Sequence, residues 1–310
     1  METKFNSNSE FANLKIKFWG VRGSKPTPGR NTILFGGNTS CVEIEAGGRT
    51  LIFDAGTGIV ELGNQLTALA GGQGIQADIF FSHLHWDHIQ GLPFFTPLYA
   101  PGNKIRLYGE DKCTEGMTFQ QVIEKQMRPP HFPITMKMMK SDYEFINLNP
   151  GGEISITENI TIKTFPVNHP NGCLAYRVES GDSAVVYATD TEPFEDETAQ
   201  KKFLDFIRGA DVLIYDTHFT DDEYFGIGDD HQSKKKWGHS TWQEGTRISK
   251  AAGVSWLILF HHKENRSDRD QQEIEIIAGQ EFENTVAARE GMTITVGGGD
   301  PEKVVINYPY

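Results

Sequence analysis

Three histidines and one aspartate lie within six residues in the first third of the chain. The segment Ser82–Gly91 reads SHLHWDHIQG and directly follows an apolar run that ends a predicted strand. Alternate side chains of an extended loop point to the same side, so His83 and His85 can bind one ion together. Asp87 and His88 follow where the chain is expected to turn into a helix, and they point to a second position nearby. This spacing predicts a metal centre, and one for two ions.

Each ion still needs ligands from elsewhere in the chain, and three further strand ends supply them. His169 follows the segment TFPVN, Asp190 follows VVYAT, and His261 follows LILF. Three apolar strands that each end in a metal-type ligand support the prediction of a metal centre. The resulting set of nitrogen and oxygen donors without thiolate favours two Zn²⁺ ions and is also compatible with Mn²⁺ or Fe²⁺.

The elements that must position these residues come in two rounds. Strands are expected at residues 14–19, 40–45, 50–54, 75–81 and 104–108, and again at 153–157, 161–166, 174–180, 184–189, 212–216, 256–260 and 293–296. Helices are expected after residue 58, at 116–127, at 241–252 and near 270–290. This pattern predicts an α/β fold in which two mixed sheets pack face to face with helices outside. We treat residues 14–310 as one four-layer domain and residues 1–13 as a flexible N-terminal tail.

Charge narrows the class of partner. The net charge of −13 argues against a grip on a long nucleic acid, because phosphate binding needs a basic face. The basic run Lys234–Lys236 is interpreted as a solvated loop, with a local phosphate-attracting patch as the alternative. A small-molecule substrate is therefore expected. The sequence leaves open whether the protein forms a homodimer.

Composition also bears on location. The first 13 residues lack the apolar core of a signal peptide, and no run reaches the roughly 18 apolar residues that a membrane span needs. Cys41, Cys113 and Cys173 show neither a disulfide framework nor a metal-binding spacing. We expect buried, reduced thiols in a cytoplasmic protein without a membrane anchor.

The order of the ligands resembles that of the metallo-β-lactamase fold hydrolases. Their hallmark is HxHxDH, followed by a histidine, a bridging aspartate and a final histidine, and the match runs from Phe18 to about Asp268. The resemblance implies an αβ/βα sandwich with two divalent metal ions at one rim. By this resemblance the first ion is held by His83, His85 and His169, the second by Asp87, His88 and His261, and Asp190 bridges both.

The resemblance also implies a mechanism. Two ions roughly 3.5–4 Å apart would hold a bridging water whose pKa falls to about 7, which provides a hydroxide nucleophile. Asp87 counts here both as a ligand and as a catalytic residue. Asp54 matches a family position that supports the histidine loop, where it would orient a ligand imidazole. Capping of the following helix is the alternative role for Asp54.

A second motif indicates which hydrolase this is. The segment Trp237–Thr241 (WGHST), placed before a helix, resembles ribonuclease Z and related phosphodiesterases, in which this histidine lies near the scissile phosphate. The resemblance implies catalytic roles for His239 and for Asp216, the carboxylate that would hold it. A proton-donating imidazole would assist the leaving oxygen. Helix capping by Ser240 or Thr241 is the alternative for the motif, but it leaves His239 unexplained.

The Gly- and Pro-rich stretch 19–30 is similar to the loop after the first strand of ribonuclease Z. It is expected to bring backbone N–H groups close to a ligand, or else to be a tight connection between strands.

Two departures argue against ribonuclease Z itself. The chain shows no Gly/Pro- and Lys-rich insertion resembling the tRNA-gripping arm, and its net charge is acidic. The expected substrate is therefore a small or cyclic phosphodiester, similar to a cyclic nucleotide. A ribonuclease Z-like RNA-processing endonuclease and a thioester or lactone hydrolase are the alternatives, and a non-enzymatic metal-stabilised binding module is least favoured. Diiron oxygen chemistry is disfavoured because that group has a glutamate where this chain has His85.

The remaining candidates are weaker. Trp86, Phe94 and Phe95, together with residues 126–133, form either an aromatic pocket over the metals or part of the core. Among the other histidines, His218 and His231 are expected on the surface or in loops. A supporting role beside the metal ligands is considered for His262, and His131 is left undecided.

Overall fold

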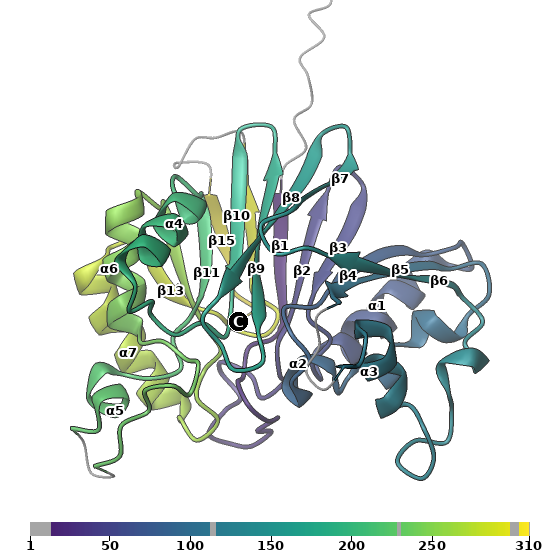
Figure 1. The fold of residues 1–310 in the computed structure, drawn as a ribbon, viewed down its shortest axis with the longest axis horizontal. Helices are drawn as coiled ribbons and strands as arrows, with labels where there is room; N and C mark the ends of the chain where they lie inside the picture. The colour runs from purple at the N-terminus through teal and green to yellow at the C-terminus, as the bar shows by residue number, and fades with distance from the viewer. Residues whose placement is uncertain (1–13, 112–115, 228–230, 298–303, 310) are drawn as a thin grey trace, which may run out of the picture.

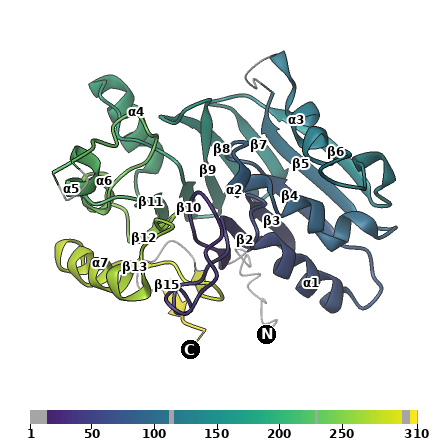
Figure 2. The same cartoon turned by 90° about the horizontal axis from the view of Figure 1, so that it is seen from below.

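Two β-sheets lie face to face, and helices cover their outer faces (Figures 1 and 2). The computed structural model describes residues 14–111, 116–227, 231–297 and 304–309, so the predicted tail and Cys113 lie outside the described residues. One sheet has eight strands in the order β15-β14-β1-β2-β3-β4-β5-β6, and the other has seven in the order β13-β12-β11-β10-β9-β8-β7. Both sheets mix parallel and antiparallel pairs. The predicted four-layer α/β sandwich is confirmed.

The strands follow the predicted ranges closely, with three additions. The first sheet contains β1 (Leu14–Gly20), β2 (Cys41–Ala46), β3 (Arg49–Phe53), β4 (Gln76–Phe80), β5 (Lys104–Glu110), β6 (Asp142–Leu148), β14 (Thr293–Val296) and β15 (Val304–Asn307). The second contains β7 (Glu153–Thr157), β8 (Ile160–Val167), β9 (Cys173–Ser180), β10 (Ser183–Ala188), β11 (Val212–Asp216), β12 (Trp256–Phe260) and β13 (Thr285–Ala287). The sequence pattern missed the strands β6, β13 and β15 and two helices, α4 (Glu197–Ile207) and α5 (Asp221–Phe225).

The helices are α1 (Ile59–Ala70), α2 (Trp86–Ile89), α3 (Phe119–Gln126), α4 (Glu197–Ile207), α5 (Asp221–Phe225), α6 (Trp242–Ala252) and α7 (Asp268–Glu281), with short 3₁₀ turns at η1 (Leu92–Phe94), η2 (Thr96–Tyr99) and η4 (Met136–Met138). The predicted end of the helix near residues 270–290 is wrong. It stops at Glu281 because the chain turns into β13, which pairs in parallel with β12. Within the described residues, no helix is both long and apolar enough to cross a membrane.

Three apolar clusters hold the layers together. The central cluster fills the space between the sheets and includes Phe53, Phe80, Tyr176 and Tyr187, whose rings contact one another. A second cluster lies under α1 and α3, and a third lies under α4, α6 and α7. Each large apolar side chain that is fully buried stabilises the fold by about 1.5–3 kcal/mol. The strands that carry the site are therefore held on both faces.

The strands β3, β4, β8, β10, β11 and β12 carry the site at their carboxyl ends, where the loops of the two sheets meet. Asp54, Asp190 and His261 each come one or two positions after such a strand, and each has a left-handed backbone with φ of 62°, 49° and 59°. Non-glycine residues in this region turn the chain sharply and are frequent at functional sites. The three left-handed residues turn the chain at the rim.

Candidate metal centre

The first group of ligand-type side chains contains three imidazoles. Ligand atoms of His83, His85 and His169 all lie within 4.8 Å of one another. His169 Nε2 lies 3.1 Å from His85 Nδ1, and the other ring nitrogen of His169 lies 2.8 Å from the Gly238 carbonyl oxygen. Donation of the Nδ1 proton to that carbonyl leaves Nε2 of His169 as a free lone pair directed at His85.

The second group contains the carboxylates. Asp87, His88, Asp190 and His261 bring one ligand atom each within 4.8 Å of the others. Asp190 Oδ2 lies 3.2 Å from His88 Nε2 and 3.3 Å from His261 Nε2. Its other oxygen, Oδ1, lies 3.9 Å from Nε2 of His83. Asp190 therefore faces both groups, one oxygen to each.

The donor set fits two divalent cations. The Nε2 atoms of His83 and His88 are buried and make no hydrogen bond of good geometry, although each faces a carboxylate or imidazole. Burial lowers the pKa of His83 well below its ordinary value and that of His169 to about 4, so both rings are neutral, as a metal ligand must be. Burial opposes the charge on Asp87 and Asp190, but the surrounding histidines hold the pKa of both carboxyls below the usual range.

The structure decides between the two interpretations of Asp54. Helix α1 is capped by Gly58 without a side-chain bond, so Asp54 is not its cap. The Asp54 carboxylate is fully buried and lies 2.7 Å from His88 Nδ1. It also accepts hydrogen bonds of 2.7 Å from the backbone N–H and the hydroxyl of Ser82 and from the hydroxyl of Tyr187. Asp54 thus fixes His88 and the first residue of the histidine loop.

The Gly- and Pro-rich loop after β1 reaches the same rim. The backbone N–H of Ser24, a residue with φ of 64°, donates to Asp87 Oδ2 at 2.7 Å. Gly23 packs so closely that a β-carbon there would lie 2.6 Å from the His261 ring. The expectation that this loop brings a backbone N–H to the site is met at Asp87.

His239 and Asp216 lie beside the second group. His239 Nδ1 is 2.8 Å from Asp216 Oδ2 and 3.8 Å from Asp190 Oδ1. Burial works against protonation of His239, but the carboxylate of Asp216 outweighs it and raises the pKa of the imidazole to about 9. Asp216 is held in turn by the backbone N–H groups of Thr191 and His218. Thr241, not Ser240, caps α6 by accepting from the Glu244 N–H, so capping leaves His239 free for another role.

His218 was expected on the surface or in a loop; it lies in the loop after β11, but it is buried. Only 4 % of its surface is exposed, and its ring stacks on that of His239 with centroids 4.6 Å apart. Its Nδ1 atom lies 3.1 Å from the His261 carbonyl oxygen. Burial, and then the neighbouring His239, lower the pKa of His218 well below its ordinary value. The sequence feature that could have predicted this position is the spacing of His218 from Asp216, because residues two apart in an extended chain face the same side.

The other histidines lie away from the centre. His262 is fully buried, but its Nε2 atom lies 2.8 Å from the Ala288 carbonyl oxygen and its ring packs on Phe35. It is a core residue with no contact to the two ligand groups among those described. His131 and His231 are exposed, the latter as expected.

Glu192, which the sequence analysis missed, fixes the segment that carries His239. Its carboxylate accepts from the backbone N–H groups of Lys236 at 2.7 Å and Gly238 at 3.2 Å, and from the Tyr224 hydroxyl. The expectation of a solvated lysine run is wrong for Lys234, which is buried with its ammonium group against the Trp237 ring.

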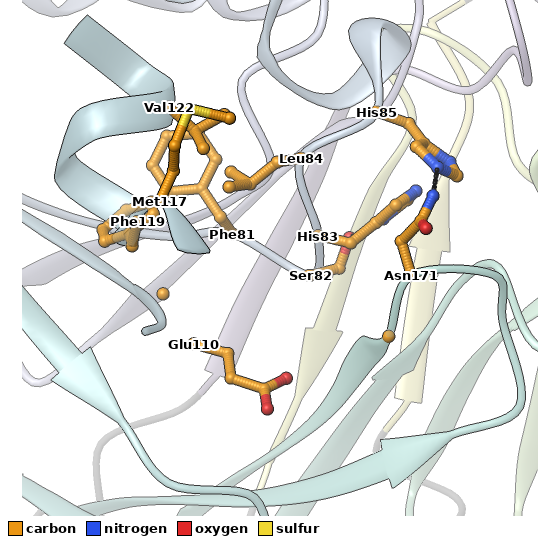
Figure 3. Close-up of a pocket in the computed structure, with 12 residues that line it drawn as sticks. Phe81, Ser82, His83, Leu84, His85, Glu110, Met117, Phe119, Val122 and Asn171 are labelled. Carbon is orange, nitrogen blue, oxygen red and sulfur yellow. Dashed lines mark hydrogen bonds between the residues drawn. The ribbon is translucent and has the colours of Figure 1, made fainter. Parts of the chain in front are cut away.

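Of the aromatic residues considered either for a pocket over the metals or for the core, only Phe95 lies in the core. Trp86 is 69 % exposed, Phe94 is exposed and packs edge-on against Phe132, and Phe95 is buried in the core. A different cavity of about 160 Å³ lies beside the first group, lined in part by His83 and His85 (Figure 3).

Comparison with known proteins agrees with the fold. The sequence model of the beta-lactamase superfamily domain matches residues 49–262, and the chain belongs to this superfamily. Ribonuclease Z of Gemmatimonas aurantiaca is 25 % identical over 336 residues, which cover 91 % of this chain and 95 % of that protein.

Solved structures share the fold. The metallo-β-lactamase fold protein YhfI from Bacillus subtilis aligns over 92 % of this chain and 99 % of its own, with a TM-score of 0.65 and 20 % identity. A diphosphatase of the PhnP family aligns over 90 % and 96 %, with a TM-score of 0.62 and 17 % identity. The chain is a metal-dependent hydrolase of this fold, and the fold implies a dinuclear divalent-metal site at the histidine and aspartate cluster.

Proposed function

We propose that this hydrolase is a phosphodiesterase that cleaves a small or cyclic phosphodiester. The observation that carries the proposal is the pair of the partly buried His239 and the fully buried Asp216, which faces the second ligand group through Asp190. A metal centre has no need of this pair, whereas a phosphodiester needs a proton at its leaving oxygen.

The two ions would be held by the two groups of side chains described above. His83, His85 and His169 would bind the first, Asp87, His88 and His261 the second, and Asp190 would bridge them. Zinc is the metal we favour, because imidazole and carboxylate donors suit it, with Mn²⁺ and Fe²⁺ as the other candidates. When bound, two such ions supply a nucleophilic water of lowered pKa and neutralise charge on the phosphoryl oxygens.

Residues of the chain itself supply the proton and hold the ligands in place. His239, kept protonated by Asp216, donates its proton to the departing ester oxygen. The Ser24 N–H and the Asp54 carboxylate orient Asp87 and His88, so that these ligands keep one geometry throughout turnover. The carboxylates of Asp87 and Asp190 stay ionised at neutral pH because histidines surround them.

The test is hydrolysis of bis(p-nitrophenyl) phosphate by protein loaded in turn with Zn²⁺, Mn²⁺ and Fe²⁺. We expect turnover that a chelator abolishes and that falls strongly in His239→Ala. Absence of turnover with all three metals would refute the proposal. Thioester or lactone hydrolysis that survives His239→Ala would instead establish the alternative chemistry of this fold.

A ribonuclease Z-like activity is the second candidate, because curated relatives that match along 91 % of this chain bear that name. The net charge of −13 weighs against a long RNA substrate. Cleavage of a precursor tRNA at its 3′ end, compared with cyclic nucleotides under the same conditions, separates the two.

A further inference from the structure

Glu192 lies two residues after Asp190, in the segment that follows β10, and it contacts two loops that carry residues of the site. Its backbone N–H donates to the carbonyl oxygen of Asn168 at 2.8 Å, which fixes the residue directly before His169. Only 7 % of its surface is exposed, so its carboxylate depends on donors from the protein. Glu192 therefore stands between the turn that carries His169 and the segment that carries His239.

Both oxygens of the Glu192 carboxylate accept hydrogen bonds from the chain just before His239. Oε1 accepts from the backbone N–H of Lys236 at 2.7 Å and from the Tyr224 hydroxyl, and Oε2 accepts from the backbone N–H of Gly238 at 3.2 Å. Lys236 and Gly238 have left-handed backbones, with φ of 70° and 84°. A non-glycine residue keeps such a conformation only where its surroundings hold it. The carboxylate of Glu192 supplies this hold on both sides of the intervening residue.

Gly238 passes the anchoring on to a metal-ligand candidate. Its N–H is held by Glu192, and its carbonyl oxygen lies 2.8 Å from Nδ1 of His169. The fit is close, because a β-carbon at Gly238 would lie 2.3 Å from that same Nδ1 atom. The next residue along the chain is His239, whose ring centroid lies 5.4 Å from that of His169. A displacement of Gly238 would therefore move both imidazoles.

We propose that Glu192 is a positioning residue that acts through Gly238 on His169 and His239 together. The inference rests on the proposed function, in which His169 holds the first ion and His239 protonates the leaving oxygen. The Glu192 carboxylate contacts neither imidazole directly. It keeps the Gly238 carbonyl aimed at Nδ1 of His169, which leaves Nε2 of that ring as the lone pair for the ion.

The test is Glu192→Gln, which keeps the shape of the side chain but turns one acceptor oxygen into an NH₂ donor that faces a donor of the loop. We expect the affinity for one of two Zn²⁺ ions to fall by about tenfold in competition with a chromogenic chelator, the lower end of the range for groups that support a ligand. With both sites saturated, kcat on bis(p-nitrophenyl) phosphate should fall about tenfold at little change in KM, because His239 loses its alignment.

Glu195→Gln is the matched control. It removes the same charge three residues later, where the side chain is exposed, and should change neither quantity. Equal metal affinities of Glu192→Gln and Glu195→Gln would overturn the inference. Glu192→Asp, which keeps both acceptor oxygens on a shorter side chain, takes the place of Glu192→Gln if that variant does not fold, and the same loss of affinity is expected.

The His169→Ala background shows whether the effect passes through His169. This variant should retain the second ion alone, and addition of Glu192→Gln should leave the affinity for that ion unchanged. A further loss of about tenfold in this background would show that Glu192 acts on the whole rim, and it would overturn the proposed path.

The metal titrations need no turnover, so they separate this inference from the proposed function. If the unsubstituted protein hydrolyses no phosphodiester, the phosphodiesterase proposal fails, and the Zn²⁺ titrations still decide the role of Glu192 at His169. If turnover is present and kcat of Glu192→Gln is unchanged at saturating metal, the link to His239 is refuted while the phosphodiesterase proposal stands.

Discussion

The Nδ1 atom of His239 lies 2.8 Å from the Oδ2 atom of Asp216, a carboxylate without solvent exposure. Two backbone N–H groups, from Thr191 and His218, hold the same carboxylate in place. The imidazole therefore sits in one orientation beside Asp190, and its proton is retained because the adjacent negative charge raises the pKa. A purely structural capping segment would not need this arrangement.

The pair predicts the effect of Asp216→Asn on phosphodiester hydrolysis. The amide keeps one acceptor oxygen, which serves only one of the two backbone N–H groups, and it no longer stabilises a protonated imidazole. We expect kcat to fall by about 100-fold, within the range of general acid catalysis, while KM changes little. Steady-state kinetics and metal analysis of the same sample check this, since loss of bound metal would show that Asp216 acts structurally.

The hydrogen bonds of Asp54 predict a loss of metal affinity in Asp54→Asn. Its carboxylate orients His88 and holds Ser82, so the variant should bind metal about 10–100-fold more weakly. Tyr187→Phe removes one hydrogen bond from the same carboxylate and should cost only about 1 kcal/mol in the free energy of unfolding. Competition titration with a chromogenic chelator measures the affinity. Equal affinities for Asp54→Asn and Tyr187→Phe would contradict the assigned role.

The two ligand groups predict different metal contents for single variants. His169→Ala removes a ligand from the first group alone and should leave close to one bound ion for each chain. Asp190→Ala removes the residue that faces both groups and should reduce binding at both. Elemental analysis after dialysis reads out the stoichiometry. Retention of two ions in His169→Ala would refute the assignment.

Removal of the metals should lower the melting temperature without unfolding the chain. The apolar clusters between and outside the sheets do not depend on the ions, whereas ligand binding stabilises the native state by about 2.7 kcal/mol at a concentration of 100 Kd. Circular dichroism melts with and without a chelator measure the shift. An unfolded metal-free protein at 25 °C would contradict this expectation.

Two glycines with left-handed backbones form a matched pair. A β-carbon at Gly238 (φ 84°) would lie 2.3 Å from His169 Nδ1, whereas one at Gly253 (φ 66°) would meet no atom within 4 Å. Alanine at either site strains the backbone by about 1–2 kcal/mol. We expect Gly238→Ala alone to lose activity and affinity for the first ion as well, which kinetics and metal titration compare with Gly253→Ala.

The two rounds of strands and helices, together with the family resemblance, sufficed to predict the sandwich fold. The motif around His83 and the three later strand ends led to the ligand set that we propose. Ligand-type residues carry their chemistry in their identity, and apolar runs that end in such residues are visible in the chain. The prediction weakened where local pattern does not specify neighbours. Strand β6, at the edge of its sheet, and helix α4 were missed; most of their residues stay at least partly exposed, so their places in the fold depend on packing more than on an apolar run.

Three outcomes depended on the packing of the two sheets. Asp54 supports the ligand candidate His88 and does not cap a helix, His218 is buried beside His239, and His262 points into the core. The cavity at Glu110 and Asn171 likewise joins β5 to the β8–β9 turn, segments about 60 residues apart in sequence. The sequence by itself determined which residues could bind metal and which pair could move a proton. Only the tertiary structure decided which side chains face them, because those contacts arise between elements that are distant along the chain.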